Sequence, residues 1–140
     1  MTRRSKKLPL RYWLILFPLL GGPGAGSAHH SASMFDFGRC VAVSGTVRAL
    51  EWTFPHVWLW VDVPEGPDRT RPWGFENGSP ASLTRKGWSR TALKAGDRVS
   101  VRFFPLKDGR PGGNLATVSV PGGSVLPGVP FACNAAPPKP

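Results

Sequence analysis

The chain has 140 residues, with 18 Lys and Arg against 8 Asp and Glu and a formal net charge of +10. This length supplies one hydrophobic core and excludes a protein with two. The content of 17 Gly and 16 Pro approaches that of low-complexity chains, yet 6 Trp and 8 Phe supply more bulky apolar surface than a disordered chain carries. The composition therefore predicts one folded, turn-rich and mostly β domain.

Residues 1–28 have the three parts of a secretory signal in the right order. Basic residues between Arg3 and Arg11 precede an apolar run over 12–20, and small residues then lead to Ala28. The alternative is an uncleaved membrane anchor, but a run of about nine residues is short of the roughly 20 that span a bilayer. We expect cleavage after Ala28, a mature chain that starts at His29, and a periplasmic or secreted protein that does not span the membrane.

Export would change both the net charge of the mature chain and the expected oxidation state of its two cysteines. Five of the 18 basic residues lie in the signal segment, so residues 29–140 carry a net charge of only +5. An exported protein meets glycans, lipids and envelope proteins, so no nucleic-acid partner is expected. Cys40 and Cys133 are predicted to form a disulfide in an oxidising compartment, the alternative being two free buried thiols.

The mature chain begins with two strand patterns and a short third one. Residues 41–52 alternate apolar and polar side chains, and Gly45 suggests a bulge there. A second strand is predicted over 56–63 and a third over 71–76. Ser79 and Pro80 then open a helix over 81–88, which Gly87 closes.

Two further strands complete the pattern, over 98–104 and 114–120, with Gly112 and Gly113 assigned to the hairpin turn between them. This order predicts an all-β fold, a small five-stranded OB-like (oligonucleotide/oligosaccharide-binding) barrel with one short helix between strands 3 and 4. The rival, a β-sandwich, needs about seven strands. We assign the barrel to residues 29–126 and expect the Gly/Pro-rich chain from Pro121 on to be irregular, with 127–140 as its tail.

Spaced motifs along the chain resemble those of a bacterial family of small exported proteins, catalogued as a domain of unknown function with the number 6152. The family supplies no established activity. This sequence departs from it at Phe54, where members tend to have asparagine, and in the added pair Cys40 and Cys133. The matching motifs are Ala28-His29-His30-Ser31, Gly45-Thr46-Val47, Pro55-His56, Trp73-x-x-Glu76, Gly87-Trp88 and Gly96-Asp97.

The histidines form the first candidate site. Cleavage after Ala28 would free the amino group of His29 beside its own imidazole, and the two can chelate one metal ion. A further imidazole from His30 or His56 would complete a nitrogen-rich set of the kind that copper prefers, and Glu76 could add an oxygen. The alternative is a solvated N-terminus and a histidine that bonds to its own turn.

The tryptophans form the second candidate site. Trp52, Trp58, Trp60 and Trp73 could stack against a sugar or another planar ligand. Trp58 and Trp60 share one face of their strand, and Val57, Leu59 and Val61 lie on the other face. Core packing or a covering helix is the alternative.

The leading hypothesis is an exported, non-enzymatic binding protein whose ligand is a metal such as copper, a glycan or another small molecule. The alternative is a structural or assembly module that docks a partner protein of the cell envelope. A hydrolase built on Glu51 and Glu76 is a third reading, but the sequence carries none of the common catalytic motifs.

Overall fold

A computed structural model of the protein describes residues 32–120 and 122–134. The predicted signal segment, His29 and His30 lie outside these residues. Within them, none of the helices has the length and apolar character needed to cross a lipid bilayer.

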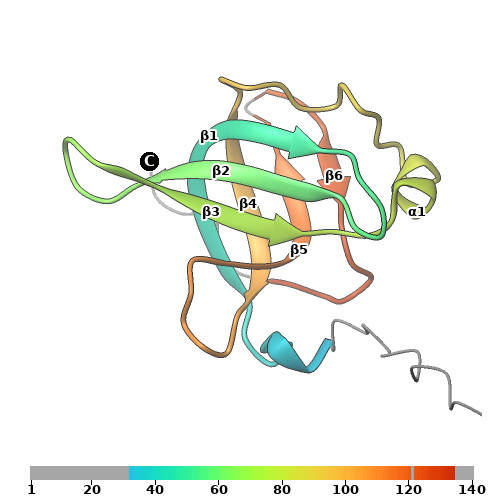
Figure 1. Ribbon diagram of the computed structural model, residues 1–140, viewed down its shortest axis with the longest axis horizontal. Helices are drawn as coiled ribbons and strands as arrows, with labels where there is room; N and C mark the ends of the chain where they lie inside the picture. The colour runs from blue at the N-terminus through green and yellow to red at the C-terminus, as the bar shows by residue number, and fades with distance from the viewer. Residues whose placement is uncertain (1–31, 121, 135–140) are drawn as a thin grey trace, which may run out of the picture.

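Five strands form a closed barrel and a sixth extends its sheet (Figure 1). The strand order is β3-β2-β1-β4-β5-β6, and β3 also pairs with β5 in parallel, which closes the barrel. The five-stranded all-β barrel predicted from the sequence is therefore confirmed. The strands are β1 (Val41–Glu51), β2 (Trp58–Pro64), β3 (Thr70–Glu76), β4 (Arg98–Pro105), β5 (Gly112–Ser119) and β6 (Val125–Pro127).

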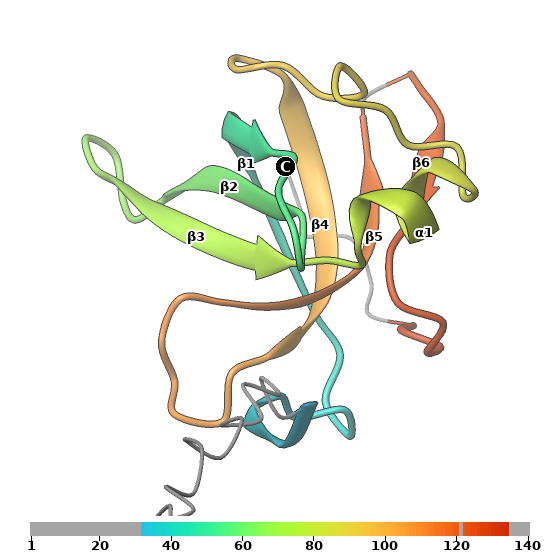
Figure 2. The same ribbon diagram turned by 45° about the vertical axis from the view of Figure 1, so that its right-hand side comes forward.

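One short α-helix, α1 (Pro80–Thr84), stands between β3 and β4 as predicted, beside the barrel end near β5 (Figure 2). Ser79 caps it by accepting a hydrogen bond from the backbone N–H of Ser82 at 3.3 Å. The regular helix is shorter than the predicted 81–88, since it ends at Thr84 with Arg85 as its C-cap. Gly87, with a positive φ of 88°, lies in the turn that follows. A three-residue 3₁₀ helix, η1 (Ala32–Met34), precedes the barrel and was not predicted.

The barrel interior follows from the alternation of side chains along each strand. In β2, Leu59, Val61 and Val63 are buried, while Trp58 and Trp60 lie on the opposite face and are only partly buried. Phe75, Phe103 and Leu115 fill the same core from three other strands. The two tryptophans share one face, as the alternation predicted, and the structure shows that this face is the outer one.

Gly112 and Gly113 allow the start of β5 to lie close to its two neighbours, β3 and β4. A Cβ atom on Gly112 would lie 2.0 Å from the carbonyl oxygen of Gly74, and one on Gly113 would lie 2.1 Å from that of Phe104. Gly112 also has a φ of 132°, which side chains rarely tolerate. Their assignment to a hairpin turn was wrong: both are strand residues, selected for the close approach of two backbones.

The bulge of β1 is displaced from its predicted position at Gly45. The pairing of β1 with β2 shifts between Val47 and Ala49, so the extra residue is Arg48, which is paired with Asp62 at 2.8 Å. Gly45 instead stays in register with β4, and a Cβ there would lie 2.4 Å from the carbonyl oxygen of Asp62.

The segment that follows Pro121 is more ordered than predicted, because it contains β6. This strand pairs with β5 at Thr117–Ser119, beyond the stretch of β5 that pairs with β3. It thereby covers a sheet edge that would otherwise expose unpaired backbone groups. The buried Trp88 holds it in place by donating a 2.8 Å hydrogen bond from Nε1 to the carbonyl oxygen of Pro127.

The predicted disulfide between Cys40 and Cys133 is present. It lies in a second hydrophobic cluster outside the barrel, where Phe35 packs on Phe104 and Ala116. The segment before β1 and the segment after β6 both contribute to this cluster. The disulfide thus joins the two ends of the described chain against β4 and β5.

We predict that Gly112→Ala lowers the free energy of unfolding by about 2–3 kcal/mol or more, because the added methyl group meets backbone that cannot give way. Gly66→Ala is the control, since Gly66 also has a positive φ but no atom within 4 Å of an added Cβ. Urea denaturation of both variants measures the difference. Equal losses would show that the β3–β5 contact does not require glycine.

We predict that the double variant Cys40→Ser, Cys133→Ser loses up to about 4–5 kcal/mol of stability, since the bridge closes a loop over a sequence separation of 93 residues. Guanidinium denaturation with and without reductant checks this value. Two reactive thiols in denatured, unreduced protein would contradict the bridge itself.

Candidate ligand-binding site

The outer face of β2 carries two stacked indole rings. The ring centroids of Trp58 and Trp60 are 5.9 Å apart and their planes differ by 18°. Trp60 lies over Gly74 of β3, where an added Cβ would come within 2.7 Å of the ring. The missing side chain at Gly74 therefore makes room for the flat aromatic surface.

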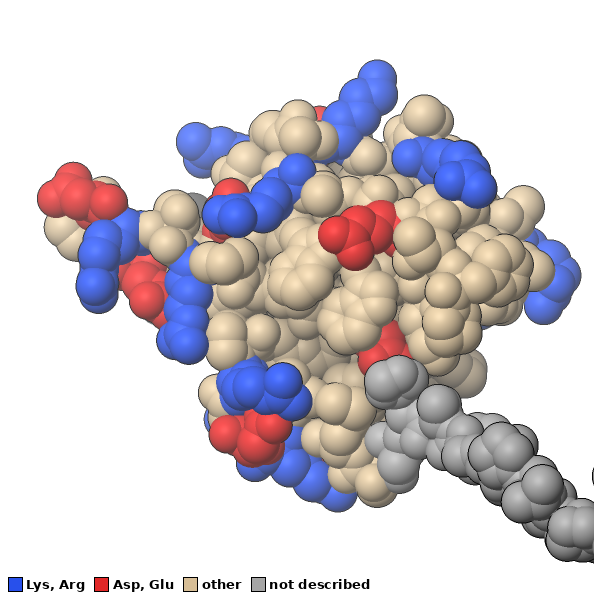
Figure 3. Space-filling view, viewed as in Figure 1, with Lys and Arg blue, Asp and Glu red and all other residues tan. Residues whose placement is uncertain are grey.

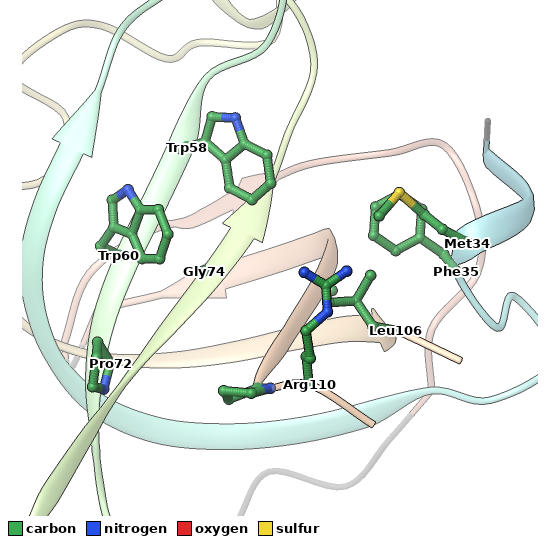
Figure 4. A pocket seen from close by; sticks show the side chains of 10 residues that line it. Met34, Phe35, Trp58, Trp60, Pro72, Gly74, Leu106 and Arg110 are labelled. Carbon is green, nitrogen blue, oxygen red and sulfur yellow. The ribbon is translucent and has the colours of Figure 1, made fainter. Parts of the chain in front are cut away.

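A cleft of about 300 Å³ adjoins this aromatic surface, and we call it the tryptophan cleft. In Figure 4, Trp58 and Trp60 stand on one side and Met34 and Phe35 on the other. Its volume lies at the lower end of the range for small-molecule pockets. The lining residues are Met34, Phe35, Trp58, Trp60, Pro72, Gly74, Leu106, Arg110, Pro111 and Gly113.

The loop between β4 and β5 holds a cation at the cleft. Asp108 accepts from the backbone N–H of Arg110 at 3.1 Å and from its Nε at 2.8 Å. These bonds, the backbone one first, lower the pKa of the Asp108 carboxyl. The guanidinium of Arg110 points into the space between the tryptophans and Met34 (Figure 4).

Charged side chains surround the molecule unevenly. The front face in Figure 3 has a broad central area of mostly uncharged atoms with acidic side chains within it, and most Lys and Arg lie around it. This is the face on which β2 and β3 lie toward the viewer in Figure 1. The residues that line the tryptophan cleft are apolar apart from Arg110.

The structure brings two of the predicted metal ligands together. Nδ1 of His56 lies 3.0 Å from the main-chain oxygen of Asn77 and 3.3 Å from Oε1 of Glu76. A carbonyl oxygen only accepts, so Nδ1 carries a proton in this contact. Glu76 is buried, at 6% exposure, whereas the His56 side chain is 36% exposed.

The rest of the predicted metal set is not described. His29 and His30 lie outside the described residues, and within 32–120 and 122–134 no three His, Cys, Asp or Glu side chains gather closely enough to hold a metal ion. His56 and Glu76 are thus a pair, and copper binding stays a prediction.

The four predicted platform tryptophans divide into two pairs. Trp58 and Trp60 line the cleft, whereas Trp73 points inward and makes an edge contact with Phe103 at 5.8 Å. Trp52 packs against the barrel core. Spacing alone did not separate the pairs, because the face of each residue depends on the register of its strand.

Sequence reasoning missed the opposite side of the cleft. Met34 and Phe35 precede the first strand and show no periodic pattern, so only the folded chain places them there. Arg110 and Pro111 were assigned to a turn. The predicted fold could have indicated Arg110 and Pro111 as site residues, since the loop between strands 4 and 5 borders the ligand-binding face of such barrels.

Comparison with known proteins gives a family and no activity. No curated protein and no solved structure matches the chain. Residues 18–115 match the profile of the Family of unknown function (DUF6152), a range that covers β1 to β4, the first part of β5 and all residues that line the tryptophan cleft. Since the match extends over more than half of the sequence, the chain belongs to the Family of unknown function (DUF6152).

Proposed function

We propose that this is an exported, non-enzymatic binding protein that holds a saccharide in the tryptophan cleft. The observation that carries the proposal is the stacked pair Trp58 and Trp60 on the outer face of β2, beside a cleft of about 300 Å³. Sugar rings present apolar C–H faces that pack on indole, while their hydroxyl groups need polar partners at the edges.

The position of the cleft in the fold supports the same function. It is formed by β2, β3 and the loop between β4 and β5, which is where barrels of this type bind oligosaccharides and oligonucleotides. This is an analogy between folds, and it favours a ligand over no ligand at all. The disulfide supports export, since such bridges persist in oxidising compartments.

A second candidate function is copper binding, which the orientation of His56 favours. Metal-binding histidines usually donate their other ring N–H to a carbonyl or carboxylate, and Nδ1 of His56 has both within 3.3 Å. Glu76 would then orient the imidazole, and Nε2 would join the amino group and ring of His29 on the metal.

We predict that Trp58→Ala weakens binding of a β-1,4-linked hexasaccharide by about tenfold or more, equivalent to about 1.4 kcal/mol, because the stacking surface is lost. Trp60→Ala should act in the same way. Calorimetric titration measures the affinity, and Phe54→Ala is the control, since Phe54 is exposed and not part of the cleft. If no saccharide binds, docking of an envelope protein becomes the better explanation.

We predict that a chain beginning at His29 binds Cu(II) more tightly than the same chain extended by one N-terminal alanine. The extension turns the chelating amine into an amide without a basic lone pair. His56→Ala should also weaken binding. Competition titration compares the three proteins, and equal affinities would exclude both the amine and His56 as ligands.

A further inference from the structure

A row of side chains crosses the outer face of the barrel beside the tryptophan cleft. Strand pairing places Glu51 of β1 opposite Trp58 of β2, Trp58 opposite Glu76 of β3, and Glu76 opposite Asn114 of β5. Phe104 of β4 follows Asn114. Directly opposite residues have Cβ atoms about 4.5–5.5 Å apart, so each side chain contacts or nearly contacts the next.

The members of this row face outward together. Phe75 and Leu115 point into the core, so their neighbours Glu76 and Asn114 point to the other side of their strands. Trp58 lies on that side as well. The row thus places the Glu76 carboxylate beside Trp58 and the Asn114 amide on the far side of Glu76.

Glu76 and Asn114 carry oxygen atoms that lack donors. Within the described residues, the only polar partner of the Glu76 carboxylate is Nδ1 of His56 at Oε1, so Oε2 accepts from no group there. Oδ1 of Asn114 is buried without a hydrogen-bond partner, and Nδ2 makes one long bond of 3.5 Å to the main-chain oxygen of Glu76.

The buried Oδ1 of Asn114 is unfavourable without a donor, whereas Oε2 of Glu76 is not fully buried and is open to a donor from a ligand. A ligand that brings a charged donor would remove this cost. Two features favour a cation on the Glu76 side of Trp58: the two residues directly opposite Trp58 are both glutamates, and the indole face itself attracts positive charge. Arg110, at the other side of the cleft, disfavours a cation there.

We propose that Glu76, supported by Asn114, selects saccharides that carry a free amino group, with the sugar ring on Trp58 and its ammonium group on the Glu76 carboxylate. This inference rests on the proposed saccharide function and names the class of sugar. Hydrogen bonds to ionised groups are about twice as strong as those between neutral ones, so the preference should be large enough to measure.

Three matched ligands test the proposal. Hexamers of β-1,4-linked glucosamine, N-acetylglucosamine and glucose share one backbone and differ at a single ring position, which carries an ammonium, an acetamide or a hydroxyl group. Calorimetric titration at mildly acidic pH, with a chelator present to remove copper, compares them. We expect the glucosamine hexamer to bind the wild-type protein about tenfold or more tightly than the other two.

Two variants separate Glu76 from general charge attraction. Glu76→Gln keeps the shape and should reduce the affinity for glucosamine hexamer to that for glucose hexamer, with binding of the latter unchanged. Glu51→Gln is the matched control, since this glutamate also lies opposite Trp58 but is exposed. The Glu51→Gln variant should keep most of the preference for the glucosamine hexamer over the glucose hexamer.

The outcomes distinguish the two proposals. Equal binding of all three hexamers, each weakened by Trp58→Ala, would overturn the amine preference and keep the saccharide function. Binding of none would overturn both. Equal effects of Glu51→Gln and Glu76→Gln would show nonspecific charge attraction and overturn the role of Glu76. The comparison of ligands on the wild-type protein needs no variant, so it stands even where Glu76→Gln does not fold.

Discussion

The parallel contact between β3 and β5 is the constraint on which the rest of the structure depends. It exists because Gly112 of β5 leaves no Cβ atom against the backbone of Gly74 in β3. Without it, the strands would form an open sheet. With it, β2 and β3 come beside the loop between β4 and β5, and both sides of the tryptophan cleft are formed at once. The same contact brings Asn114 next to Glu76.

A second layer of packing supports the cleft from outside the barrel. Phe35 lines the cleft on one side and packs on Phe104 and Ala116 on the other. The Cys40–Cys133 disulfide belongs to the same cluster, so a covalent bond distant from the tryptophans helps to hold one side of the cleft. In a small barrel with a single core, such external packing supplies rigidity that the core alone does not.

The polar groups near the cleft are arranged differently from the apolar ones. Arg110 is exposed and fixed by Asp108 within its own loop, so its position depends on local hydrogen bonds. Glu76 is buried, and its contact with His56 joins β3 to the loop after β1. A buried carboxylate with one partner is costly, and such costs are commonly found where a ligand completes the set of bonds.

The sequence by itself determined the five barrel strands, the helix start at Ser79, the shared face of Trp58 and Trp60, and the pairing of the two cysteines. The strands, the helix start and the shared face follow from local patterns of two to four residues. The disulfide follows because the chain has only two cysteines. Only the tertiary structure decided that Gly112 and Gly113 belong to a strand, that β6 forms, that Trp73 turns inward and that Asn114 meets Glu76. These depend on contacts between strands far apart in the chain, and the register of such contacts is set by barrel closure, which no local pattern records.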